Sequence, residues 1–207
     1  NFKIFPLPNL YISNADLKVS NKPINFRVKD FRIYSKLKNI YNQKNLIPKK
    51  ILINSSEVDL EIKDSKELFN FLASFKSKLE ISNLNISLNK EKERIIKIKN
   101  IDYSNYGHKK NKIEGVLFNK KFEAILKNNE LKFNILKTGI KIKLNFDKIN
   151  NLKLISGSSK INILDYYLKS NFLFKTNKLE VTNSNLRNKN LSILFNSTID
   201  FDPFFKI

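Results

Sequence analysis

The sequence predicts a mainly β protein: a curved, mostly antiparallel, twisted sheet that forms a half-pipe or groove, with one α-helix near residues 65–78. Three observations support this prediction. Apolar and polar residues alternate over most of the 207 positions, which is typical of strands with one apolar face. The alternation slips by one residue at recurring Asn or Asp positions. Helical periodicity replaces it only at residues 65–78.

The slip belongs to a repeated phrase: apolar–x–apolar, a polar step containing Asn or Asp, then apolar–x–apolar again. In the first copy, Leu10-x-Ile12 is followed by Asn14, Asp16 and Leu17-x-Val19. Further copies are centred on Asp30, Asn54 to Ser56, Asn83, Asn100 and Asn183. Because strand side chains alternate between faces, each slip would turn the following apolar residues to the opposite face unless the strand bulges or bends there. We therefore expect irregular backbone at these positions.

Residues 65–78 are predicted to be helical because their apolar residues recur at i, i+1, i+3, i+4 and i+7. These residues are Leu68, Phe69, Phe71, Leu72 and Phe75. Asp64 lies three residues before Glu67, an arrangement similar to a capping box at a helix start. The simplest interpretation of the three phenylalanines is that they dock the helix on the sheet.

Strands are predicted before and after this helix. The first half contains two or three strands between residues 10 and 34, and a slipped pair at 51–53 and 58–62. The later predicted strands are 79–89, 94–104, 112–119, 121–127, 130–137, 139–147, 151–156, 159–165, 168–175, 178–182 and 190–202. With only four glycines the sequence marks no domain boundary, so residues 1–207 are predicted to be a single β-groove segment with a helical insert at 65–78. Since the chain starts at Asn1 and contains no Met, we expect it to be part of a longer protein.

The net charge of +20 comes almost entirely from lysine, since only four of the 39 basic residues are arginine. Lys, Asn, Ile and Phe are all abundant and share A/T-rich codons, so nucleotide bias explains much of the excess. The alternative is attraction to anionic membranes or to nucleic acid. Nucleic-acid recognition relies on the bidentate contacts of Arg. Phe172-x-Phe174-Lys175 interleaves aromatic and basic residues, but its phenylalanines keep the apolar parity of a strand, so no nucleic-acid partner is expected.

Residues for catalysis are sparse in this sequence. The single histidine, His108, stands beside two lysines, and there is no Cys for a thiolate nucleophile or metal site. Asp200 with Asp202, and Asp59 with Glu61, have i, i+2 spacing, which is weak support for metal or glycosidase chemistry. Phosphate-binding glycine loops and HExxH, GxSxG or CxxC motifs are absent. We therefore expect no enzymatic activity, no cofactor and no metal.

The repeated phrase resembles AsmA-like proteins of Gram-negative envelopes. The similarity is carried by Pro8-Asn9-Leu10-Tyr11-Ile12-Ser13-Asn14-Ala15-Asp16-Leu17-Lys18-Val19, by the stretch from Lys160 to Val181, and by the closing Leu191-x-Ile193-x-Phe195 and Ile199-x-Phe201-x-Pro203-Phe204-Phe205. That family resembles bridge-like lipid-transfer proteins, in which a curved sheet forms an apolar groove. The resemblance implies phospholipid traffic, outer-membrane biogenesis and a periplasmic location. It also implies inner-membrane anchoring, and contact with the membrane, through a segment absent from this chain.

The strands taken together predict more apolar surface than one short helix covers. Large exposed apolar patches on soluble proteins usually bind something. We expect this surface to hold phospholipid or another acyl lipid without catalysis, with the tails against Ile81, Leu84, Ile86, Ile98, Ile142, Leu144, Phe172 and Phe174. The alternatives are a structural or adhesion β-domain with a closed core, and a basic nucleic-acid-binding module. Oligomeric state is not predicted.

Overall fold

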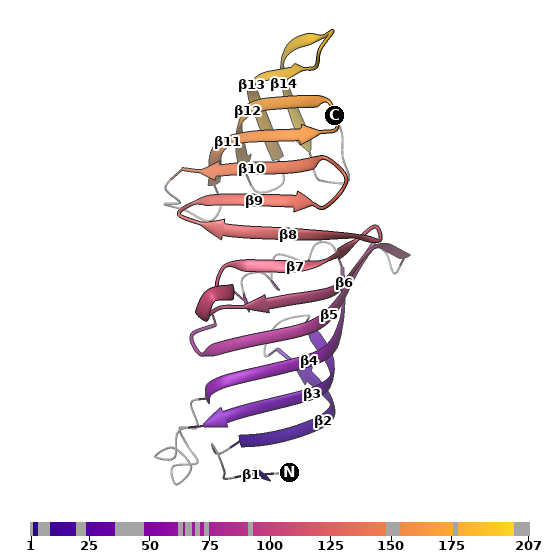
Figure 1. Cartoon of the computed structure of the whole chain (residues 1–207), viewed down its shortest axis with the longest axis vertical. Helices are drawn as coiled ribbons and strands as arrows, with labels where there is room; N and C mark the ends of the chain where they lie inside the picture. Colours follow the sequence, from indigo (N-terminus) through magenta and orange to yellow (C-terminus); the bar gives the residue numbers. More distant parts are fainter. Residues whose placement is uncertain are drawn as a thin grey trace. The chain divides into compact units, whose positions relative to one another are not determined.

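The computed structural model describes residues 2–3, 9–19, 24–35, 48–61, 64, 68, 71–72, 75–90, 93–147, 154–175 and 178–200. Nearly all of them lie in strands (Figure 1). The predicted fold class is therefore confirmed. The chain divides into two compact units, residues 1–119 and 120–207, each of which is described by itself below. Within the described ranges, no helix is long and apolar enough to cross a membrane.

Unit 1 is an open sheet in which strands neighbour one another in chain order. Its strands are β1 (Phe2–Lys3), β2 (Asn9–Lys18), β3 (Asn25–Ser35), β4 (Pro48–Glu61), β5 (Lys78–Lys90), β6 (Glu93–Ser104) and β7 (Lys112–Leu117), and a short 3-10 helix, η3 (Gly107–Lys109), follows β6. The strand pairs are antiparallel except for β4 and β5, which are parallel.

The parallel pair explains the position of the helical residues. A parallel connection must cross over one face of the sheet, and a helix usually makes that crossing. The chain between β4 and β5 contains Leu68, Phe71 and Leu72, all with α-helical backbone. Leu68 and Leu72 are buried in the core of unit 1, and the Phe71 ring lies 6.2 Å from that of Phe26 in β3. Leu68 and Leu72 therefore cover part of the apolar face of this unit. The helix predicted over 65–78 is wrong at its end, because residues 75–77 are not helical and Lys78 begins β5. Glu67 and Phe69 fall outside the described residues.

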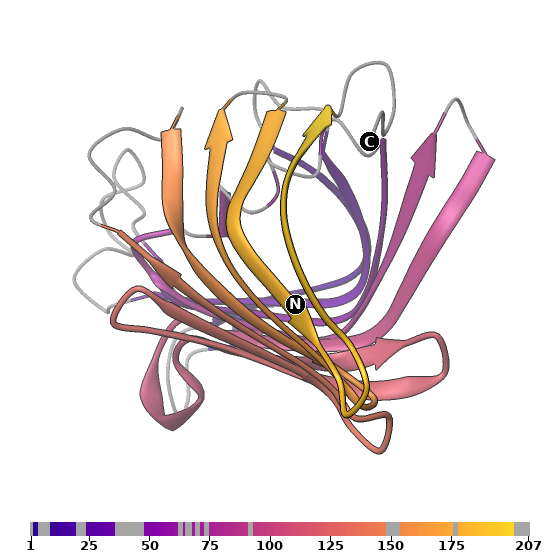
Figure 2. The ribbon, with the colours of Figure 1, turned by 90° about the horizontal axis from the view of Figure 1, so that it is seen from above.

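Unit 2 is an antiparallel meander. Its strands are β8 (Lys120–Lys127), β9 (Glu130–Ile135), β10 (Ile140–Phe146), β11 (Leu154–Ile163), β12 (Tyr166–Lys175), β13 (Lys178–Arg187) and β14 (Ser192–Asp200). Each described pair of consecutive strands is antiparallel. Figure 2 shows the orange and yellow ribbons of this unit bending along their length.

The predicted irregularity is present in the backbone at five of the six copies of the repeated phrase; the copy at Asp30 has neither a left-handed residue nor a register shift. Five strand residues have a left-handed backbone with φ between 51° and 55°: Asn14, Ser55, Asn83, Asn100 and Asn183. Asparagine is among the residues that tolerate this conformation best. The strand pairing shifts register beside Asn83, Asn100 and Asn183, as it does at a β-bulge.

Each left-handed residue returns the following apolar side chains to the original face. In β5, Leu79 and Ile81 precede Asn83, whereas Leu84 and Ile86 follow it, and all four apolar side chains are buried. If β5 were regular at Asn83, without the bulge, Leu84 and Ile86 would turn to the opposite, solvent-facing side. The sequence slip and the bulge therefore compensate each other, and the strand keeps one apolar face along its length.

The bulges also need new hydrogen-bond acceptors, because an irregular residue loses its partner in the strand ladder. The backbone N–H groups of Asn83 and Asn100 donate to the side chains of Asp102 and Asn85, at 3.0 and 3.1 Å. The N–H of Asn183 donates to Asn196 Oδ1 at 2.9 Å. Polar side chains of neighbouring strands thus stabilise bulges in both units.

Two predicted strand boundaries are wrong. Residues 151–156 and 159–165 were predicted to be separate strands, but Leu154–Ile163 is one strand, β11. Gly157 lies inside this strand. The position requires glycine, because a Cβ there would come within 2.0 Å of the carbonyl oxygen of Asn145 and 3.0 Å of the Phe172 ring. The strand predicted to end at residue 182 continues through the bulge at Asn183 to Arg187.

Candidate apolar binding face

One side of the unit 2 sheet is lined by apolar residues from β8 to β14. Ile142 in β10 lies opposite Phe133 in β9 and Ile161 in β11. Phe172 in β12 lies opposite Gly157 and Val181, on the neighbouring strands. We call this side the apolar face of unit 2. It is defined by the inward-parity residues Phe122, Ala124, Leu126, Leu131, Phe133, Ile135, Ile140, Ile142, Leu144, Phe146, Ile155, Gly157, Ser159, Ile161, Leu168, Ser170, Phe172, Phe174, Leu179, Val181, Ser184, Leu186, Phe195 and Ile199.

Most of the large side chains of this face are half-buried. In the described part of unit 2, Phe122 is the one large apolar residue that is buried, at 8% exposure, whereas Leu126 is 49% exposed. The rings of this face contact one another: Phe146 and Phe172 are T-shaped at 5.9 Å, and Phe122 lies 5.5 Å from Phe133. A sheet face with this exposure is an apolar surface available to a ligand.

A seam of small residues crosses the face. Ser159 and Ser170 are buried and share a hydrogen bond of 2.6 Å between their hydroxyl oxygens. Ser184, on the next strand, is 1% exposed, and its Oγ has no hydrogen-bond partner among the described residues. Gly157, one row away, lies against the Phe172 ring, so the larger side chains of the face cover these small residues. The sequence analysis missed this feature, although the run Gly157-Ser158-Ser159 inside an apolar pattern was its signal.

The predicted lipid-contacting residues fall into two environments. Ile142, Leu144, Phe172 and Phe174 all lie half-buried on the apolar face of unit 2. Ile81, Leu84 and Ile86 belong instead to the buried core of unit 1, with exposures of 0%, 1% and 9%. Ile98 is partly buried against that core. The chain's own side chains, including Leu68 and Leu72 of the crossover, therefore occupy the face on which these four residues lie.

The opposite side of unit 2 is basic. Lys132, Lys143, Lys160 and Lys169 occupy consecutive cross-strand positions on β9 to β12. Glu130 makes ion pairs with Lys132 at 2.9 Å and with Lys143, and the hydrogen bonds from Lys143 and then Lys132 lower the pKa of the Glu130 carboxyl. The sheet of unit 2 is thus apolar on one side and lysine-rich on the other, as its period-two alternation predicted.

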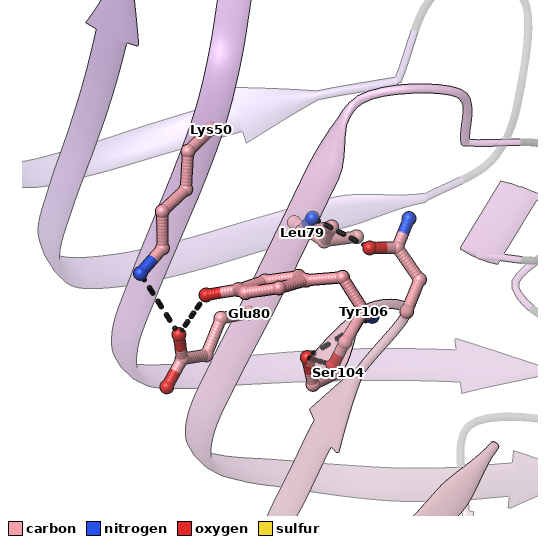
Figure 3. A network of polar contacts seen from close by, with 6 residues as sticks. Lys50, Leu79, Glu80, Ser104 and Tyr106 are labelled. Carbon is pink, nitrogen blue, oxygen red and sulfur yellow. Dashed lines mark hydrogen bonds and ion pairs between the residues drawn. The ribbon is translucent and has the colours of Figure 1, made fainter. Parts of the chain in front are cut away.

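Unit 1 contains a coupled group of titratable side chains, drawn in Figure 3. Tyr106 donates to Glu80 at 2.5 Å, and Lys50 makes an ion pair with the same carboxylate at 3.2 Å. The hydrogen bond from Tyr106, followed by that from Lys50, lowers the pKa of Glu80 despite its partial burial. Burial and the Glu80 contact raise the pKa of Tyr106. Burial opposes the charge on Lys50, but its hydrogen bonds to Tyr106 and Glu80 outweigh burial and raise its pKa.

This group joins strands. It links the parallel strands β4 and β5 to the turn after β6 (Figure 3). Asn105, beside it, accepts from the backbone N–H of Leu79 at 2.8 Å and donates to the carbonyl oxygens of Phe75 and Ser77. The adjacent cavity, lined by Glu80, has a volume of about 10 Å³, which is room for about one water molecule.

A polar groove of about 600 Å³ follows the bulges of unit 1. Asn14, Ser55, Asn83 and Asn100 line it, so the left-handed residues that bend the strands also shape this groove. Arg27, in the same groove, makes ion pairs with Glu57 at 3.7 Å and with Asp59. The guanidinium of Arg27 is thus paired within the fold.

The remaining sequence candidates for chemistry do not converge. His108 lies exposed in η3, and Asp59 is paired with Arg27. Asp202 is outside the described residues. Within the part of the chain that the structure describes, no three His, Cys, Asp or Glu side chains group in a way that could hold a metal ion. A comparison of the chain with protein-family models, curated proteins and solved structures finds no match in any of the three.

Proposed function

We propose that this chain binds acyl lipid without catalysis, and that unit 2 is the part that does so. The observation that carries the proposal is the apolar face of unit 2, on which Ile142, Leu144, Phe172 and Phe174 are half-buried and lie on strands separated only by β11. An acyl chain is unbranched and flexible. It could lie across the strands and cover the half-buried apolar side chains.

The energetics favour weak and exchangeable binding. Complete burial of a methylene gains about 0.8 kcal/mol, and an open face would bury about half of each methylene, so roughly 0.4 kcal/mol is gained. A chain of about 15 methylenes would then gain about 6 kcal/mol, equivalent to a Kd between about 1 mM and 1 μM. The cost of association weakens this further. Such a face suits a lipid in transit better than a stored one.

The lipid class and the cellular setting of this proposal rest on the resemblance of the repeated phrase to AsmA-like proteins. We propose a phospholipid or other acyl lipid as the partner, and the periplasmic side of a bacterial envelope as the location. The proposed role is lipid transfer or envelope assembly. Contact with a membrane through flanking regions beyond this chain belongs to the same proposal.

A structural role is the second candidate, and one observation favours it for unit 1. Its apolar face is closed by Leu68 and Leu72, so Ile81 and Leu84 are buried without a ligand. In this alternative, unit 1 is a rigid β-domain that supports the chain.

The proposal is tested by two matched variants of unit 2. Leu144 lies on the apolar face, whereas Leu173 lies on the opposite side of β12, and both are partly exposed. Titration with a fluorescent fatty acid should show binding by the wild type, at least about fivefold weaker binding by Leu144→Asn, and unchanged binding by Leu173→Asn. Circular dichroism and thermal unfolding verify that both variants are folded. Absence of fatty-acid binding by the folded wild type would contradict the proposal.

A further inference from the structure

Three hairpin turns of unit 2 lie at the same end of its sheet. They connect β9 to β10, β11 to β12, and β13 to β14. The register places the pairs Ile135 with Ile140, Ile163 with Tyr166, and Arg187 with Ser192 next to these turns. A Cβ added to Gly139, in the first turn, would lie 3.6 Å from the Cα of Leu164 in the second, so these two turns are in contact.

Each of the three turns holds an exposed leucine. We call Leu136, Leu164 and Leu191 the tip leucines; they are 41%, 74% and 45% exposed. Ile163, Tyr166 and Ile193, immediately next to the turns, are also more than 40% exposed. Singly exposed apolar residues are ordinary, but a group of them gathered at one end of a sheet indicates an interaction surface.

The backbone at Leu164 strengthens this interpretation. Leu164 has φ +54°, in the left-handed region that is unfavourable for a residue with a branched apolar side chain. Asn or Gly would fit that turn position better and would expose no apolar surface. Leucine at this position is therefore unfavourable for folding in water in two ways, which is expected where the side chain serves a contact.

The turns hold their leucines in fixed positions. Thr138 caps the first turn, because its hydroxyl donates to the carbonyl oxygen of Ile135 at 2.8 Å and accepts from the N–H of Ile140. In the third turn, the N–H of Asn188 donates to the carbonyl oxygen of Leu191 at 2.9 Å, and Asn188 Oδ1 accepts from the N–H of Asn190. Leu136 and Leu191 are thus presented outward by hydrogen-bonded turns.

Basic residues accompany the tip leucines. Lys137 follows Leu136, Lys189 lies in the third turn, and both are exposed. Asp165 is the acidic residue of the three turns. Together with the net charge of +20, this arrangement is complementary to a surface that is negatively charged outside and apolar beneath, as an anionic bilayer is.

The described turn at the other end of the unit 2 sheet, between β8 and β9, consists of Asn128 and Asn129, which are both left-handed and exposed. Leu154 begins β11 at this end and lies opposite Lys175, on the side away from the apolar face of unit 2. It is 46% exposed, which is similar to Leu136 and Leu191, and therefore provides a control of the same residue type at the opposite end.

We infer that the three-turn end of unit 2 docks into the interface of an anionic lipid bilayer, with the tip leucines inserted among the headgroups and acyl chains. Ile140 and Ile163 continue the apolar face of unit 2 up to these turns. Docking would therefore place one end of that face against the membrane interior. The docking itself is independent of the proposed function. Only the idea that a lipid passes from the membrane to the apolar face rests on the proposed function.

The absence of tryptophan from the chain allows a direct test of insertion. Leu164→Trp and Leu154→Trp each create a single fluorescent reporter, at opposite ends of the unit 2 sheet. With vesicles of equal parts phosphatidylcholine and phosphatidylglycerol, the emission of Leu164→Trp should shift to the blue and be quenched by brominated acyl chains. The emission of Leu154→Trp should stay unchanged. Equal responses of the two reporters, or none from Leu164→Trp, would overturn the inference.

A second experiment measures the contribution of the side chain. Leu164→Asn places a residue that tolerates left-handed backbone at the turn, so this variant should fold at least as well as the wild type. Its affinity for the mixed vesicles should fall by about tenfold, which is the effect of losing one inserted leucine, whereas Leu154→Asn should bind as the wild type does. An unchanged affinity of Leu164→Asn would overturn the inference. A wild type that binds no vesicles would also overturn it if Leu164→Asn loses self-association or RNA binding. That result would assign the turns to another partner.

The two proposals fail separately. Leu164→Asn should retain fatty-acid binding in solution, whereas Leu144→Asn should retain vesicle binding. Loss of both activities in both folded variants would contradict the separation of the docking end from the apolar face of unit 2.

Discussion

The backbone N–H of Asn83 donates a hydrogen bond of 3.0 Å to the carboxylate of Asp102, across the β5–β6 pair. Asn83 has φ +55°, so its N–H is displaced from the ladder, and Asp102 replaces the lost acceptor. Leu84 and Ile86 are buried because this bulge returns them to the apolar face. A single left-handed residue and one carboxylate thus connect the sequence slip to the formation of the core.

The left-handed backbone at Asn83 should tolerate Gly but not Val. We expect Asn83→Gly to change the free energy of unfolding by less than about 1 kcal/mol, and Asn83→Val to lower it by about 2 kcal/mol. Asn25→Val, at a regularly paired and exposed position of β3, is the control and should have little effect, because Val favours strands. Chemical denaturation of the three variants checks this; equal effects of Asn83→Val and Asn25→Val would refute the role of the bulge.

Asp102 should matter as an acceptor rather than as a charge. Asp102→Asn retains a side-chain oxygen for the Asn83 N–H, whereas Asp102→Ala leaves that N–H without this acceptor. We expect Asp102→Ala to lower the free energy of unfolding by about 1 kcal/mol, and Asp102→Asn by less than half of that. Hydrogen exchange at the Asn83 amide should accelerate in Asp102→Ala. Unchanged exchange there would show that the hydrogen bond is not stabilising.

Two buried serines should be better replaced by alanine. Ser56 and Ser184 are 0% and 1% exposed, and neither Oγ has a hydrogen-bond partner within the described residues. Ser56→Ala and Ser184→Ala should each raise the free energy of unfolding by about 1 kcal/mol, because each substitution removes a buried hydroxyl that makes no hydrogen bond. Ser170→Ala is the control: it removes the hydrogen bond with Ser159 and should destabilise the protein. Thermal unfolding of these variants decides the prediction, and a destabilised Ser184→Ala would reveal a partner for its hydroxyl.

Acid should weaken the contact between Glu80 and Tyr106. The folded state lowers the pKa of Glu80, so this contribution to stability is present above the ordinary pKa of the carboxyl and is lost as the pH falls through the lowered value. Between neutral pH and about pH 3, the difference in unfolding free energy between the wild type and Glu80→Gln should therefore shrink. Denaturation curves at several pH values measure it. A difference that is constant over this range would show that ionised Glu80 is not the stabilising form.

The lysine row on the outer side of unit 2 should oppose folding slightly. Lys160 lies opposite Lys143 on one strand and Lys169 on the other. Since like charges on directly opposed positions repel, Lys160→Glu should raise the free energy of unfolding by a few tenths of a kcal/mol, about 0.5 at low salt. High salt should abolish the gain. A gain that persists in high salt would have a cause other than charge.

The sequence shows the apolar pattern of each strand, but it does not show which segments of the chain cover the apolar face of each sheet. The slips at Asn83, Asn100 and Asn183 predicted bulges, because the alternation on both sides of each slip is local and has to be kept on one face. The helical periodicity of Leu68 and Leu72 likewise predicted the crossover helix.

The covering of a face depends on packing between distant segments. Leu84 and Leu144 stand in equivalent alternating patterns, yet Leu84 is buried and Leu144 is half-buried. The difference arises because the chain between β4 and β5 crosses the face of unit 1, as a parallel pair requires. The parallel pairing of these two strands was the missing information, and the helical segment between them was its signal.

The most direct test of lipid binding uses methyl NMR with a spin-labelled fatty acid, because paramagnetic broadening reports which side chains the acyl chain approaches even when binding is weak. The account predicts broadening of the Ile142 and Leu144 methyl signals on the apolar face of unit 2, and sharp signals for Ile81 and Leu84 in the closed core of unit 1. Sharp signals at Ile142 and Leu144 with a saturating concentration of the fatty acid would contradict it.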